Sequence, residues 1–178
     1  MTRVAAVVLA AGAATRFGSP KQQLLLPRVL ERLRASAVDE IVVVGGAYEV
    51  CVEATQAPLV RHVRCAEWER GPGASLRCGL EALDAGVDAA VVVLADGPLL
   101  APAAVDRVLT SWEVDRADVV AASYGGVRGH PLVVDRAVWA SVPDEGLRTL
   151  EPRLVPCDDL GFPGDVDTPD DLARLDEP

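Results

Sequence analysis

The chain alternates short valine-rich runs with stretches rich in alanine, leucine and arginine, and this alternation constrains its fold more than any other feature. Valine-rich runs favour strands, and the stretches between them have helical spacing. Strands that alternate with helices predict an α/β domain, three layers deep, with a mainly parallel central sheet. The most apolar run, Ala89 to Ala95, is the expected central strand because both of its faces must be covered.

A length of 178 residues allows one domain with a substantial core and is short for two. No repeat, linker or low-complexity segment divides the chain, so residues 1–178 are expected to form a single domain. Strands are expected at Val4–Leu9, Glu40–Val44, Leu59–Arg64, Ala89–Ala95, Asp118–Ala122 and Leu132–Val134, and helices at Arg28–Ala37, Glu49–Ala54, Gly71–Leu83 and Pro102–Trp112. The sequence "YGGVRGHP" is expected to form a turn between the last two strands, and Thr168 to cap a final helix.

The formal net charge is −10 and the pI is near 4.6, with no basic stripe. Such a surface repels phosphate backbones and anionic lipids, so nucleic acid and membrane are not expected partners. No apolar segment approaches the ~20 residues that span a bilayer. A small anionic substrate is still compatible with this charge where a few basic groups converge.

The four cysteines, Cys51, Cys65, Cys78 and Cys157, have no CxxC spacing. An even number permits disulfides, but a domain of this size does not need them, and reduced buried thiols in a cytoplasmic protein are the favoured interpretation.

The start of the chain supports a second interpretation. Arg3, the apolar run from Val4 to Ala11 and the small residues up to Ala13 imitate a secretory signal peptide, which would make the rest a secreted binding domain. The run is short and leads into a charged, glycine-containing loop, which favours a strand and a cytoplasmic location.

That loop, within "LAAGAATRFGSPKQQLLL" (residues 9–26), has the composition of a phosphate-binding loop. Gly12 and Gly18 allow backbone N–H groups to approach a phosphate, and Arg16 adds a planar cationic fork. Lys21, the only lysine in the chain, is a compact charge suited to bridging phosphate oxygens. The loop is neither a Walker A motif nor a GxGxxG turn, which disfavours ATPases and dehydrogenases.

Carboxylates follow the central strand and lie near the end of the chain. Asp96 ends the most apolar run, and Asp165 and Asp167 lie in "GDVDTPDDL". Asp96 and Asp167 are candidate ligands for Mg²⁺, although both positions also suit helix caps. His130 lies between Gly129 and Pro131, and a lone histidine in such a turn is more often structural than catalytic.

With these clusters the chain resembles the MobA-like nucleotidyltransferase superfamily, whose members have a Rossmann-like fold. "LAAGAATRFGSPKQQLLL" resembles its signature, "VLADGPLL" its metal-binding stretch and "GDVDTPDDL" its closing motif. "GPGASLRCGL" and "RGHPLV" are most similar to the branch of molybdenum cofactor cytidylyltransferases.

The resemblance implies a role for each matching residue. It implies nucleotide binding by Leu9, Ala10, Ala11, Gly12, Arg16, Gly18, Lys21 and Ser75. It also implies catalytic roles for Arg16, Lys21 and Asp96, Mg²⁺ binding by Asp96 and Asp167, and an acceptor site bordered by Gly129, His130 and Pro131.

The implied reaction moves a nucleoside monophosphate from an NTP, with CTP favoured, to a phosphorylated acceptor such as molybdopterin, releasing pyrophosphate. A molybdoenzyme or its accessory protein is the partner that this acceptor implies. Two departures from the family pattern bear on the acceptor: the segment after Leu26 is short, and Gly97 replaces a larger residue. Alternatives are a cytidylyltransferase of isoprenoid synthesis and a non-catalytic nucleotide- or cofactor-binding homologue.

Overall fold

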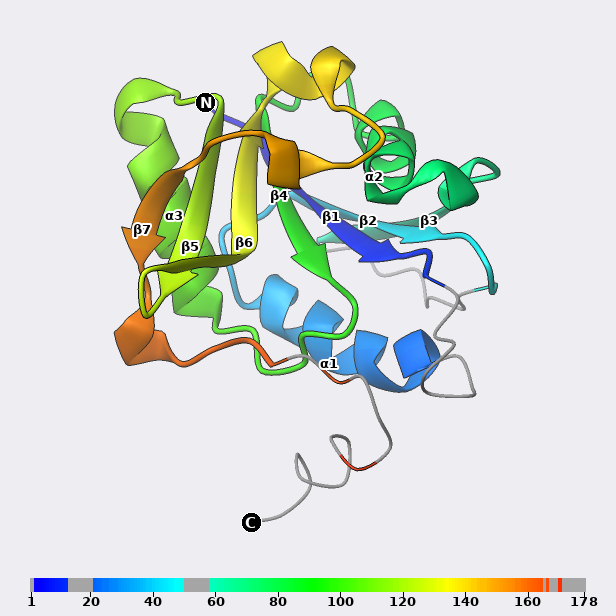
Figure 1. Cartoon of the computed structure of the whole chain (residues 1–178), viewed down its shortest axis with the longest axis horizontal. Coiled ribbons are helices and arrows are strands. Elements are labelled where there is room, and N and C mark those ends of the chain that lie inside the picture. Colours follow the sequence, from blue (N-terminus) through cyan, green and yellow to red (C-terminus); the bar gives the residue numbers. More distant parts are fainter. Residues whose placement is uncertain (1, 13–20, 50–57, 165, 167–169, 171–178) are drawn as a thin grey trace.

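The computed structural model describes residues 2–12, 21–49, 58–164, 166 and 170, with residues 21–23 described through their backbone alone. Within these ranges a seven-stranded sheet has the order β3-β2-β1-β4-β6-β5-β7, which crosses Figure 1 from right to left. The strands are β1 (Val4–Ala10), β2 (Glu40–Gly45), β3 (Leu59–Arg64), β4 (Ala89–Leu94), β5 (Val119–Tyr124), β6 (Val127–Asp135) and β7 (Arg153–Pro156). The α-helices are α1 (Lys21–Arg34), α2 (Pro72–Glu81) and α3 (Pro102–Asp115), and short 3₁₀ helices span Trp68–Arg70, Arg136–Ser141, Leu147–Thr149 and Asp158–Leu160.

The sheet separates two hydrophobic layers, as alternation along β1 shows. Ala6 and Val8 pack in the layer that contains the apolar faces of α1 and α3. Ala5 and Val7 belong to the opposite layer, which contains the buried face of α2. Side chains of successive strand residues point to opposite faces, so a run of small apolar residues can serve both layers. The expected three-layer α/β fold is confirmed (Figure 1).

β4, the expected central strand, is the middle strand of the sheet, and β1 is the interior strand beside it. β1 pairs in parallel with β2 on one side and with β4 on the other. The apolar run that imitates a signal peptide is therefore a strand of the folded domain. None of the helices in the described ranges has the length and apolar character needed to cross a membrane.

The prediction for α1 was wrong at both ends. The helix spans Lys21–Arg34 instead of Arg28–Ala37, and Pro27 lies inside it. A proline removes one helical hydrogen bond and costs about 3 kcal/mol. Leu25 and Leu26, which directly precede Pro27 within α1, are almost fully buried, and each fully buried leucine contributes about 1.5–3 kcal/mol. Burial of the apolar face thus outweighs the proline.

The expected turn at residues 124–131 was also wrong in extent. Gly125 and Gly126 have φ of 59° and 76°, which permits a two-residue hairpin turn. β6 therefore begins directly afterwards, at Val127, and runs antiparallel to β4 and β5. This reversal places the first residues of β6 beside the carboxyl end of β4. His130 lies in a strand, and its peptide bond to Pro131 is cis.

One strand was not predicted, and one expected helix lies almost entirely outside the described residues. β7 was missed because its four residues, Arg153–Pro156, carry no alternation long enough to recognise. Of the expected helix from Glu49 to Ala54, only Glu49 is described, and it is not helical. Thr168 lies outside the described residues.

The expectation of reduced cysteines was wrong for one pair. Cys65, directly after β3, and Cys78 in α2 form a disulfide, with their Cα atoms 5.8 Å apart. The fold brings these positions within the separation that a disulfide requires, which sequence spacing alone does not reveal. Cys157 is a buried free thiol, and Cys51 lies outside the described ranges.

Candidate active site

A cavity of about 360 Å³ lies at the carboxyl ends of β1 and β4. It gathers residues from separate parts of the chain that the sequence singled out: Leu9, Ala11, Gly12, Ser75 and Asp96. Ligands of parallel α/β sheets collect at this edge. The adjacent Ala10 is buried in β1 and does not line the cavity.

Backbone hydrogen bonds fix the floor of the cavity. The N–H of Ala47 donates to the carbonyl of Ala11 at 3.1 Å, and the N–H of Ala95 donates to the carbonyl of Leu9 at 3.1 Å. The end of β1 is therefore tied to the chain beyond β2 on one side and beyond β4 on the other. The loop that starts at Gly12 consequently begins from a fixed point.

The opposite wall comes from the start of α2, where a close backbone approach requires glycine. A Cβ built on Gly73 would lie 1.7 Å from the carbonyl oxygen of Pro143. The N–H of Gly73 donates to the carbonyl of Asp144 at 2.9 Å. Ser75, one turn into the helix, is buried in this wall. The stretch "GPGASLRCGL" thus owes its glycines partly to packing against residues 143–146.

Asp96 occupies the end of the cavity nearest β4. Its carbonyl accepts the N–H of Val166 at 3.2 Å, so the chain immediately before Asp167 is tied to the end of β4. Asp165 and Asp167 themselves lie outside the described residues. A carboxylate at this position has the oxygen chemistry that Mg²⁺ and Mn²⁺ prefer. Among the described residues no group of three metal-ligating side chains forms, and the two-aspartate metal site stays a prediction.

The predicted phosphate-binding side chains are not described. Arg16 and Gly18 lie outside the described ranges, and Lys21 is described only as the first residue of α1. The helix therefore starts where the predicted loop ends. N-termini of helices favour anionic groups, which fits a phosphate-binding role for the preceding loop.

Two smaller cavities, of about 240 and 190 Å³, continue the first one along the sheet edge. Leu94 lines all three cavities, and Arg128, Gly129 and His130 line both smaller ones. Pro131 does not line them. Gly97 lines the 190 Å³ cavity, so its missing side chain leaves room there. We refer to these three adjoining cavities, which share lining residues, as the groove, with a proposed nucleotide end and a β6 end.

His130 is a neutral base at neutral pH. Its pKa is lowered from 6.5 to about 4, chiefly by burial; the nearby Asp96 raises the pKa in part, and Arg128 adds to the lowering. The influence of Asp96 on this pKa links the two ends of the groove electrostatically. An unprotonated imidazole can orient a ligand through hydrogen bonds but carries no positive charge.

Arg128 was not singled out from the sequence. Its guanidinium donates to the carbonyls of Leu147 and Leu150, at 2.9 Å each. Burial lowers the pKa of this arginine. The arginine fastens the segment after Gly146 to β6 and so shapes the wall of the 240 Å³ cavity. The only sequence signal for it was its place beside the glycine-histidine-proline triplet.

Comparisons with known proteins agree with this geometry. The family model of the MobA-like NTP transferase domain matches residues 6–151. The protein Rv0371c from Mycobacterium tuberculosis H37Rv is 29% identical, with a TM-score of 0.80 and coverage of 98% of each chain. A structure of Rv0371c in complex with manganese is 28% identical over 98% of this chain and 97% of that one, with a TM-score of 0.75.

A more distant structure has the same fold. It is the 4-diphosphocytidyl-2C-methyl-D-erythritol synthase from Anaerococcus prevotii, which is 15% identical over 99% of each chain with a TM-score of 0.68. No curated protein matches the chain.

Proposed function

Because the chain belongs to the family of MobA-like NTP transferases, we propose that it transfers a nucleoside monophosphate from CTP to a phosphorylated small acceptor. The observation that carries this proposal is the groove of three adjoining cavities. One cavity gathers Ala11, Gly12, Ser75 and Asp96, and it adjoins the cavities beside His130. A transferase with two substrates needs two such adjacent spaces.

In the proposed reaction an acceptor phosphate oxygen attacks the α-phosphorus of CTP, a new P–O bond forms, and pyrophosphate leaves. The acceptor is already anionic, so no strong general base is needed, and the neutral His130 is compatible with an orienting role. Catalysis then depends on placing the two substrates in line and on stabilising negative charge. Arg16 and Lys21 are the side chains we assign to the triphosphate.

A divalent cation, Mg²⁺ in this proposal, would add positive charge beside the phosphates when bound. Asp96 and Asp167 would hold it. Support comes from the carboxylate at the end of β4, from the hydrogen bond between Val166 and Asp96, and from the manganese complex of Rv0371c.

Molybdopterin is the acceptor we propose, with a molybdoenzyme or its accessory protein receiving the product. The stretches "GPGASLRCGL" and "RGHPLV", which resemble the molybdenum cofactor branch, line the two ends of the groove through Ser75 and His130. The alternative acceptor of isoprenoid synthesis is less favoured because Gly97-Pro98 stands where that family has an Arg-Pro pair.

The test is pyrophosphate release by the purified protein, with each of the four common NTPs against molybdopterin and against methylerythritol phosphate, with Mg²⁺ or Mn²⁺. We expect release with CTP and molybdopterin, and loss of that release in Asp96→Asn. A clear GTP preference would correct the base, and turnover with methylerythritol phosphate would correct the acceptor. CTP binding without turnover on any acceptor would indicate a non-catalytic homologue.

A further inference from the structure

The three tryptophans of the chain differ in one respect. The indole N–H of Trp112 donates to the Asp135 carboxylate at 3.0 Å, and that of Trp139 donates to the carbonyl of Val134 at 3.1 Å. The indole of Trp68 makes no hydrogen bond within the described ranges, although its side chain is partly buried. Trp68 instead lines the 360 Å³ cavity. The indole nitrogen of Trp68 is not among the buried side-chain atoms without a partner in the described ranges, so its N–H is accessible to a ligand in the cavity.

Trp68 is held in contact with the floor of the cavity. A Cβ built on Gly46 would lie 2.7 Å from Cγ of Trp68 and 2.8 Å from Cβ of Ala11. Only a glycine at position 46 allows the indole to lie so close to the chain after β2. The aromatic ring is therefore seated beside the residues that start the phosphate-binding loop.

The order of the strands separates Trp68 from Asp96. β1 lies between β2 and β4 in the sheet. Trp68 packs on Gly46, directly beyond β2, whereas Asp96 follows β4. One cavity thus has an aromatic, uncharged end and a carboxylate end. A nucleotide has the same division, because a flat base is joined through ribose to a charged phosphate chain.

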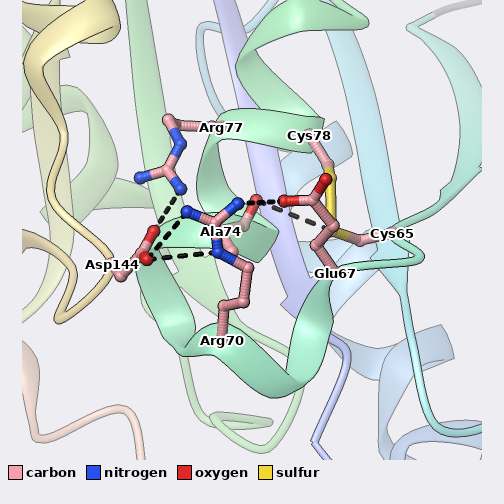
Figure 2. The surroundings of a disulfide bond; sticks show 7 residues. All are labelled: Cys65, Glu67, Arg70, Ala74, Arg77, Cys78 and Asp144. Carbon is pink, nitrogen blue, oxygen red and sulfur yellow. Dashed lines mark hydrogen bonds and ion pairs between the residues drawn. A yellow bond between two sulfur atoms is a disulfide. The ribbon is translucent and has the colours of Figure 1, made fainter.

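The segment that carries Trp68 is anchored on both sides (Figure 2). The Cys65–Cys78 disulfide links the end of β3 to α2 across this segment. Arg70 pairs with Glu67 and, at 3.0 Å, with the carboxylate of Asp144, to which Arg77 of α2 also pairs. An aromatic side chain on a fixed segment loses little conformational entropy when a ligand binds.

We propose that Trp68 contacts the nucleobase of the bound NTP through its ring, with the indole N–H donating to an oxygen of the base or ribose. This inference rests on the proposed function of the cavity. It adds a base-binding residue that the resemblance to other nucleotidyltransferases did not supply.

Calorimetry with two probes tests the assignment. CTP carries a base and a triphosphate, whereas inorganic tripolyphosphate carries only the phosphates. In Trp68→Ala we expect CTP affinity to fall about 10-fold or more, the usual loss when a base–aromatic contact is removed. Tripolyphosphate affinity should stay unchanged, and Trp68→Phe should recover part of the CTP affinity.

Trp139→Phe is the matched control, since Trp139 lines a different cleft, beside α2 and Arg136. It should bind CTP like the wild type and keep the CTP-induced change in tryptophan fluorescence, which Trp68→Phe should lose. Unchanged CTP affinity in Trp68→Ala would overturn the inference. Equal losses of CTP and tripolyphosphate affinity would also overturn it, because the residue would then only support the wall. Absence of CTP binding to the wild type is a different result, which would refute the proposed function itself.

Discussion

At the scale of single residues, the position of His130 makes stability depend on pH. Its pKa is 6.5 in the unfolded chain and about 4 in the folded protein because burial disfavours the charged form. Between these values the unfolded state binds more protons, so the free energy of unfolding decreases as the pH falls from about 6.5 towards 4. Above about pH 6.5 the imidazole is neutral in both states, so His130 no longer lowers the free energy of unfolding.

Urea unfolding at pH 7, 5.5 and 4.5, without divalent cations, measures this effect. Wild-type protein should lose more stability across the series than His130→Gln, which has no group titrating there. Parallel losses in the two proteins would show that other groups control the acid sensitivity.

A second residue-scale prediction concerns Lys21, at the first position of α1. We expect Lys21→Ala to keep the fold and to weaken binding of CTP and of tripolyphosphate alike. Lys21→Arg should restore binding only in part because a planar fork replaces a compact charge. Calorimetry on the two variants measures both affinities. An unchanged affinity in Lys21→Ala would show that this lysine is an ordinary surface charge with no part in phosphate binding.

Several of these residues were recognisable from the sequence because their chemistry conflicts with their surroundings. Asp96 interrupts an apolar run, and Lys21 is the only lysine. Trp68 and Arg128 carried no such signal. The importance of Trp68 lies in an indole without a partner in the described chain and in its contact with Gly46, and contacts of that kind exist only after folding.

At the scale of elements, strand prediction was correct for β1, β2 and β4. Both faces of these strands are buried, so their sequences contain uninterrupted apolar runs that can be recognised. Prediction of α1 failed because Pro27 was given more weight than the buried leucines around it. The predicted turn between β5 and β6 was too long. Gly125 and Gly126 tolerate positive φ, so a two-residue turn suffices and β6 starts directly after it.

The segment between β3 and α2 gives the element-scale prediction. Reduction of the Cys65–Cys78 disulfide by a dithiol yields two thiols, and closure of a loop of this length contributes about 3 kcal/mol to stability. We expect the melting temperature to fall by roughly 6–12 °C, and CTP affinity to fall with it because Trp68 and Ser75 lie within the loop that the disulfide closes. The same dithiol should leave the Cys65→Ser/Cys78→Ser variant unchanged. A wild-type melting curve that does not respond would contradict the stabilising role.

At the scale of the whole molecule, the sheet brings together sites far apart in sequence. Asp96 ends β4, and Val166, bonded to it, precedes Asp167. If the two aspartates bind one cation, each alanine variant should lose roughly 10²-fold or more in turnover. The double variant should lose little beyond that, since groups acting as one unit are not additive.

Two measurements on the three variants decide between a shared cation and a helix-capping role: pyrophosphate release and the melting temperature. Helix caps would each cost about 1 kcal/mol of stability and leave turnover nearly intact. Asp118→Asn is a suitable control. Asp118 lies at the amino end of β5, whereas Asp96 lies at the carboxyl end of β4, and these two strands run in the same direction.

The reversed direction of β6 has a consequence for how such a protein can diverge. The proposed nucleotide end of the groove is built from residues 9–12, 68–75 and 94–96, none of which belongs to the β5–β6 hairpin. The β6 end depends on that hairpin, through residues 128–130. The hairpin thus contributes only to the proposed acceptor end, although Leu9, Pro72 and Leu94 line cavities at both ends. Changes confined to the hairpin would therefore alter the proposed acceptor end while leaving the lining of the nucleotide end of the groove intact.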